Sequence, residues 1–157
     1  MEKTKISSEI KKWLDEKRWK YHFDSDRSII NANVVLDCNC ASNKVKLIVD
    51  IREDFYLVYV ILPVRCSENL AEMLRFLAMV NFGMINGNFE VDVHDGEIRY
   101  KTYVNCDKME ALPEQIIADS IICACVTVRR YACSIARICE CANGATAELE
   151  IKQSEGD

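Results

Sequence analysis

The chain has 157 residues, of which 50% are hydrophobic and 29% are charged, and its formal net charge is −5. This length and composition fit one ordinary globular domain with its own core. An acidic chain is a poor partner for phosphate backbones, so nucleic-acid binding is disfavoured, and no apolar run reaches the ~20 residues of a membrane helix. The N-terminus has charges of both signs and no apolar segment of the secretory type, which predicts a cytoplasmic protein without a membrane partner.

The spacing of apolar residues predicts three helices. The first spans roughly Lys5 to Glu16, because its apolar residues recur at helical intervals. The second begins near Ser67, a plausible N-cap, and ends at Gly83. The third runs from Pro113 to about Cys141 and is apolar on nearly all sides over part of its length, so it is expected to pack on two sides.

Three strand-like runs separate the first two helices. The runs are Ser28 to Asp37, Lys44 to Ile51 and Phe55 to Leu62. The last run is apolar at every position, which predicts a central strand covered on both faces. Pro63 is expected to end it, because proline cannot serve a central ladder.

An aromatic segment precedes these strands. Trp19, Tyr21 and Phe23 place an aromatic ring at every second position. This alternation suits either an extended segment or an aromatic lid over the core.

The final two strands form a hairpin within Asn81 to Val104. Alternation around Asp95-Gly96 predicts a two-residue type I′ turn, with one face of the hairpin in the core and the other in water. This register places Glu90 opposite Lys101, a pair of opposite charges that favours the pairing by roughly 0.2–1 kcal/mol.

The predicted order is therefore α-β-β-β-α-β-β-α. It folds most simply as an α+β sandwich, in which helices pack against an antiparallel-rich, five-stranded sheet. We expect a single α+β domain over residues 1–147 and a polar, disordered tail over residues 148–157.

Four features together resemble the YbjN-like bacterial proteins. They are the N-terminal helix ending in aromatic residues, the apolar third strand followed by Pro63, the helix LAEMLRFLAMVNF, and GMINGNFEVDVHDGEIRYKTYV followed by a long helix. The resemblance covers roughly Lys5 to Cys141 in order and length, and its most specific part is Asn81 to Val104. The family is described as proposed sensory transduction regulators. Its fold is similar to that of type III secretion chaperones, small α+β proteins that often dimerise and bind extended peptide segments.

The resemblance implies a regulatory or chaperone-like protein that binds a protein or peptide partner, and it supplies no catalytic residue. The residues agree, because no nucleophile elbow, Walker A loop or dinucleotide-binding glycine motif is present. His94 is expected to form a cross-strand surface pair with Glu97. We therefore predict a non-enzymatic protein with no catalytic residue and no cofactor.

Nine cysteines are present, and without a secretory context they do not indicate a disulfide framework. Six of them form C-x-C pairs, namely Cys38/Cys40, Cys123/Cys125 and Cys139/Cys141. No C-x-x-C occurs, and residues two apart on a helix point about 200° apart, so the four cysteines of the two C-x-C pairs in the last helix cannot converge on one ion. We expect reduced cysteines that serve as small hydrophobic residues, with no metal site. The alternative function is a cysteine-based metal or redox sensor that uses Cys123, Cys125 or Cys133.

The predicted apolar surface exceeds what a five-stranded domain needs. We hypothesise that part of it forms a homodimer interface or a groove for a partner peptide of unknown identity, while the alternative that all of it is core stays open. The candidate interaction residues are Trp19, Tyr21, Phe23, Ile121, Val128 and Tyr131.

Overall fold

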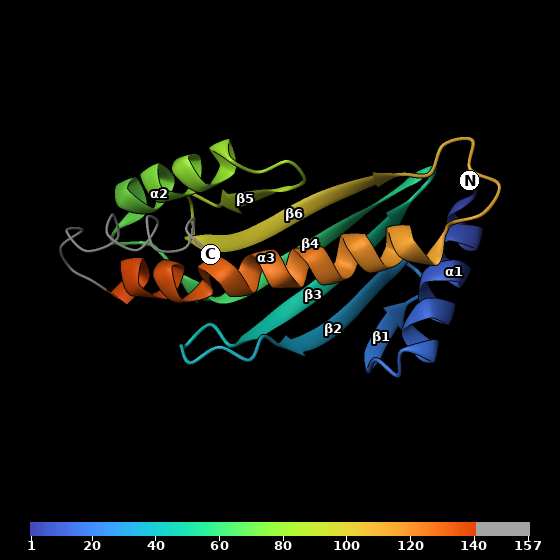
Figure 1. Ribbon diagram of the computed structural model, residues 1–157, viewed down its shortest axis with the longest axis horizontal. Coiled ribbons are helices and arrows are strands. Elements are labelled where there is room, and N and C mark those ends of the chain that lie inside the picture. Colours follow the sequence, from blue (N-terminus) through green and yellow to red (C-terminus); the bar gives the residue numbers. More distant parts are fainter. Residues whose placement is uncertain (141–157) are drawn as a thin grey trace.

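The computed structural model describes residues 1–140, which form a six-stranded antiparallel sheet with three helices on one face (Figure 1). In chain order the elements are α1 (Lys3–Glu16), β1 (Tyr21–Asp24), β2 (Ile29–Val35), β3 (Lys44–Arg52), β4 (Phe55–Arg65), α2 (Leu70–Phe82), β5 (Asn88–Val91), β6 (Glu97–Asn105) and α3 (Glu114–Glu140). The strands lie in the order β1-β2-β3-β4-β6-β5. The predicted tail over 148–157 and the end of the predicted domain, 141–147, lie outside the described residues.

The α+β class is confirmed, but the sheet has six strands and not five. The additional strand is β1, which contains the aromatic alternation and pairs antiparallel with β2. Tyr21 lies opposite Ala32 and Phe23 lies opposite Ile30, so both aromatic side chains point to the face that the helices cover. The segment is therefore an edge strand whose rings help to close the core.

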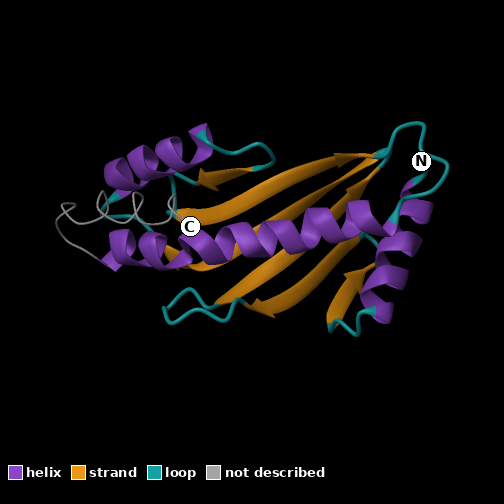
Figure 2. Ribbon diagram, viewed as in Figure 1, coloured by secondary structure: helices purple, strands orange, loops and turns teal. Residues whose placement is uncertain are grey.

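Helix α3 runs along the sheet across β4 and β6, with α1 near its beginning and α2 near its end (Figures 1 and 2). Ile117, Ile121 and Val128 on its inner side are fully buried. One polar contact lies within this apolar layer, where the Tyr56 hydroxyl is 2.9 Å from Ser120 Oγ. Within residues 1–140, no helix combines the length and the apolar character needed to cross a bilayer.

The opposite face of the sheet is open, so the prediction that the third strand-like run is covered on both faces is wrong. Strand β4 alternates between buried residues such as Val58 and half-buried residues such as Tyr59. The guanidinium of Arg99 lies 4.8 Å from the Tyr59 ring centroid and donates to Glu90 at 2.8 Å. Long charged side chains thus lie over apolar residues of this face. A run that is apolar at every position does not show whether a second layer or charged side chains cover it.

Strand β4 also continues through Pro63 to Arg65, so the prediction that Pro63 ends the strand is wrong. The pairing with β6 shifts register between Ile61 and Arg65. An irregularity of this kind accommodates a residue that has no N–H to donate to the ladder.

The hairpin of β5 and β6 lies where it was predicted, but its register differs by two residues. Glu90 pairs with Arg99, and Asp92 N donates to the Glu97 carbonyl at 2.8 Å, which leaves a four-residue loop. The Asp92 carboxylate accepts a hydrogen bond from His94 N at 2.9 Å, and this local contact starts the loop two residues earlier. Because the shift is even, Phe89, Ile98 and Tyr100 keep the core face, whereas Val93 falls in the loop and is 57% exposed.

Helix α2 begins later than predicted. Its N-cap is Asn69 and not Ser67, and the Asn69 amide donates to the Ile138 carbonyl of α3 at 2.9 Å. A tertiary contact thus decides where the helix starts. Gly83 follows the helix as predicted, with φ of −91°, a value that any residue adopts.

Candidate functional site

The predicted aromatic surface residues lie beside α1 and have partners within the domain. The Trp19 and Trp13 ring centroids are 6.1 Å apart, and the Tyr21 hydroxyl donates to a carboxylate of α1 at 3.0 Å. The Lys11 ammonium lies 4.4 Å from the Phe23 ring centroid. All three aromatic residues are half-buried, so they form a lid over one end of the core.

The predicted interaction residues of α3 divide between core and surface. Ile121 and Val128 are fully buried, whereas Tyr131 is half-buried. The exposed apolar side of α3 consists instead of Ile122 and Val126, which are 46% and 59% exposed. Within the described residues the helix packs through one side only, so the prediction that it packs on two sides is not confirmed, and its second apolar side carries residues that the sequence did not single out.

A groove of about 510 Å³, lined by both apolar and polar side chains, lies between α2, the loop 83–87, β6 and α3. Of the residues predicted for interaction, Tyr131 belongs to its lining. Asp119 and Arg130 contribute charges of opposite sign. The remaining lining residues are Met79, Val80, Phe82, Gly83, Met84, Ile85, Asn86, Tyr100, Thr102, Ser120, Cys123, Ala124, Val126 and Thr127.

Two large apolar side chains of this groove project into water. Phe82 is 96% exposed and Ile85 is 104% exposed, while Met79 beside them is 48% exposed. Burial of a side chain of this size contributes roughly 1.5–3 kcal/mol of favourable free energy. Phe82 and Ile85 would each gain this free energy if a partner covered them. Clustered exposed apolar side chains are typical of a binding surface.

The end of α2, which carries Phe82, and the following loop, which carries Ile85, are hydrogen-bonded to the sheet. Asn81 uses its side-chain amide to bond both the N–H and the carbonyl of Phe89, at 2.8 and 2.9 Å. The Asn86 carbonyl accepts a hydrogen bond from the Tyr100 hydroxyl, and its side chain accepts one from Thr102 at 3.2 Å. These hydrogen bonds therefore fix the backbone on both sides of Ile85, where the loop borders the groove.

Sequence reasoning missed Phe82 and Ile85, although a signal was present. Both residues flank Gly83 in the stretch NFGMINGN, and neither belongs to the buried stripe of α2 or to the alternation of the hairpin. An apolar residue that fits neither pattern of its neighbours is a candidate for a contact outside the domain.

Five of the eight cysteines in the described residues form two groups. Cys66 and Cys106 are 1% and 0% exposed and lie in the core, where they take the place of small hydrophobic residues. Cys38, Cys40 and Cys133 are half-buried, and their sulfur atoms all lie within 4.8 Å of one another. The sequence did not predict this cluster, because Cys133 approaches the other two from a different element.

No protein-family model matches the chain, and no curated protein sequence gives a significant match. Among solved structures it is similar to YbjN from E. coli, a proposed transcription regulator, with a TM-score of 0.56 and 12% identity over 94% of this chain and 92% of that one. It is also similar to a chain of the HopA1-SchA chaperone-effector complex, with a TM-score of 0.55 and 11% identity over 82% of this chain and 92% of that one. Likeness at such identities concerns the fold. The resemblance inferred from the sequence is therefore confirmed at that level, and the chain has the α+β fold found in YbjN and in a chaperone-effector complex.

Proposed function

We propose that this protein acts without catalysis by binding a segment of another polypeptide in the groove between α2 and α3, as a regulator or chaperone-like protein of the cytoplasm. The observation that carries the proposal is the exposure of Phe82, the last residue of α2, and of Ile85 on the hydrogen-bonded loop that follows, at 96% and 104%. A fixed loop that holds large apolar side chains in water lowers the entropic cost of binding, because the binding surface is already formed.

The chemistry of the groove favours a partner segment with large apolar side chains. Met79, Ile85 and Val126 offer aliphatic surface, and the half-buried Tyr131 offers a ring within the same groove. One solved structure with this fold belongs to a chaperone-effector complex, which supports a polypeptide as the occupant. A homodimer in which a second copy fills the groove is the competing occupant.

Insertion of side chains is the favoured mode of binding. Strand addition at the outer edge of β5 is impeded at Phe89, whose N–H and carbonyl are both occupied by the Asn81 side chain. A partner is therefore expected to place apolar anchors between α2 and α3.

The test uses a library of random peptides selected against the immobilised full-length protein. We expect the selected peptides to contain spaced large apolar residues and to bind a Phe82→Asp/Ile85→Asp variant about 100-fold more weakly, as the loss of a hot spot of roughly 2–4 kcal/mol implies. Val35→Asp is the matched control, because Val35 is also largely exposed, at 65%, but lies outside the groove.

Peptides that bind wild type, the double variant and the control equally would contradict the proposal. Sedimentation over a concentration range addresses the competing occupant. A dimer in wild type that becomes a monomer in the double variant would assign the groove to a second copy.

A further inference from the structure

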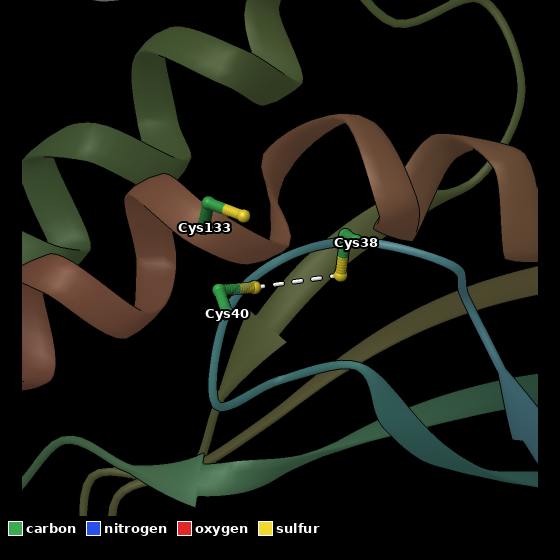
Figure 3. Close-up of side chains that lie close together, drawn as sticks. All are labelled: Cys38, Cys40 and Cys133. Atoms are coloured by element: carbon green, nitrogen blue, oxygen red, sulfur yellow. Dashed lines mark hydrogen bonds between the residues drawn. The ribbon is translucent and has the colours of Figure 1, made fainter.

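Three thiols from two distant parts of the chain face a common space between a loop and α3 (Figure 3). Cys38 and Cys40 lie in the loop 36–43 between β2 and β3, and Cys133 projects from α3. The Cys38 and Cys40 sulfur atoms are 3.4 Å apart, and all three sulfur atoms lie within 4.8 Å of one another. Metal–sulfur bonds of about 2.3 Å hold sulfur atoms roughly 3.8 Å apart in tetrahedral and roughly 4.0 Å apart in trigonal geometry. The sulfur–sulfur distances of the cluster, from 3.4 Å to at most 4.8 Å, thus include those expected for a metal–thiolate centre.

The loop that supplies two of the thiols is held in place. Leu36 N donates to the Asn43 carbonyl at 2.7 Å, and Asn43 N donates to the Cys40 carbonyl at 3.2 Å. Leu36 and Ser42 are 5% and 0% exposed, so the loop packs against the domain at two points. The third thiol is carried by a long helix. Little rearrangement is needed to close the three sulfur atoms on an ion.

A role in the core does not account for this cluster. Cys38, Cys40 and Cys133 are all half-buried, in contrast to Cys66 and Cys106. They are close enough to the surface to be reached by an ion, and their sulfur atoms face one another.

The mutual contacts change the acidity of the thiols. Burial and a hydrogen bond with Cys40 raise the pKa of Cys38. Burial, together with hydrogen bonds and charge interactions with Cys40 and Cys38, raises the pKa of Cys133 to about 12. Cys38 and Cys133 therefore favour the protonated form when no cation is bound. A bound cation reverses this preference, because a coordinating thiol gives up its proton.

We infer that Cys38, Cys40 and Cys133 bind one thiophilic closed-shell metal ion, Zn²⁺ or Cu⁺. Thiolates select such soft ions, whereas Mg²⁺ and Ca²⁺ require oxygen ligands. Within residues 1–140, no fourth histidine, cysteine or carboxylate ligand joins the group. Three sulfur atoms complete a trigonal Cu⁺ site, or they leave the fourth position of a tetrahedral Zn²⁺ site open.

Binding exchanges three S–H bonds for three sulfur–metal bonds and releases three protons to the solvent, so the affinity rises with pH. The ion connects the loop 36–43 to α3. Since it binds only where the three thiols are brought together, it stabilises the folded state.

The experiment titrates the reduced full-length protein with Zn²⁺ and, in a separate anaerobic arm, with Cu⁺, each against a competing chromophoric chelator. We expect one equivalent of either ion to bind, and Cys133→Ser to bind at least about 100-fold more weakly. Cys123→Ser is the matched control, because Cys123 is an exposed cysteine of the same helix outside the cluster, and it should bind as wild type does. Tight binding of only one of the two ions identifies which ion the site selects.

Alkylation followed by mass spectrometry gives a second readout that needs no substitution. Bound metal should protect Cys38, Cys40 and Cys133 from alkylation and leave Cys123 reactive. The inference is overturned if neither ion binds stoichiometrically, if Cys133→Ser binds as tightly as wild type, or if protection falls on other cysteines. It is also overturned if the cluster remains an intramolecular disulfide after mild reduction.

Discussion

Replacement of Gly96 by alanine is expected to lower the free energy of unfolding by about 2–3 kcal/mol. Gly96 has a φ of 72°, and a Cβ atom there would lie 2.7–2.8 Å from three backbone atoms of Cys66. A left-handed conformation costs a non-glycine residue roughly 1–2 kcal/mol. The overlap also separates Cys66 N from the Gly96 carbonyl, which it contacts at 2.9 Å, and loss of this hydrogen bond adds about 1 kcal/mol.

The assay is urea unfolding followed by circular dichroism, with thermal unfolding beside it. For a chain of this length, 2–3 kcal/mol corresponds to a melting temperature lowered by about 4–12 °C. Gly83→Ala is the matched control, because Gly83 has a φ of −91° and a Cβ atom there would have its nearest neighbour 4.0 Å away. The control should be neutral or raise stability by up to about 1 kcal/mol, since alanine restricts the unfolded chain.

Equal midpoints for the two glycine variants would refute this reasoning. They would show that the hairpin loop does not approach Cys66 as the structure has it. The four-residue loop, and with it the register of β5 on β6, would then have to be revised.

Four further substitutions test three other sets of contacts. Ser120→Ala should lower the free energy of unfolding by about 1–3 kcal/mol, because it leaves the buried Tyr56 hydroxyl without this partner. Tyr56→Phe should lower it by about 1 kcal/mol or less, and thermal denaturation compares the two variants. Asn81→Ala should lower the free energy of unfolding by about 2 kcal/mol, because two hydrogen bonds to Phe89 are lost. Hydrogen exchange at the Phe89 amide should become faster for the same reason. Burial raises the pKa of Glu90, but hydrogen bonds from a lysine and an arginine of β6 outweigh it and leave this pKa below its usual 4.5. The ionised carboxylate therefore stabilises the fold above pH 4.5. The stabilisation is lost as the pH falls through the lower pKa of the folded state, so the stability difference between wild type and Glu90→Gln should shrink as the pH is lowered below 4.5.

Local patterns in the sequence predict the helices and the hairpin well, because these elements follow from the spacing of apolar residues. The stripe that contains Ile121 and Val128 is buried under α3, as helical spacing indicates. The register of the hairpin was missed because a side-chain contact of Asp92 sets the loop length. Cross-strand charge pairing did not reveal the shift, since Glu90 contacts both Arg99 and Lys101.

The groove and the thiol cluster depend on tertiary structure. Phe82 and Ile85 become a surface only when α3 lies beside the end of α2, and Cys133 joins Cys38 only when α3 crosses the sheet toward the loop 36–43 (Figures 1 and 3). Periodicity describes each element alone and does not report which elements meet. A glycine shows the same limit, since Gly87 is required because Tyr100 packs against it, at a position 13 residues away in the chain.

The most direct measurement of the proposed function is photo-cross-linking from the groove in cells that make the protein. A photoreactive phenylalanine analogue in place of Ile85 should give a discrete product with a second polypeptide, identified by mass spectrometry, and Phe82→Asp should abolish that product. The same analogue in place of Val35 should not form it. The account predicts a product that depends on Phe82; no product from position 85, or the same products from positions 85 and 35, would contradict it.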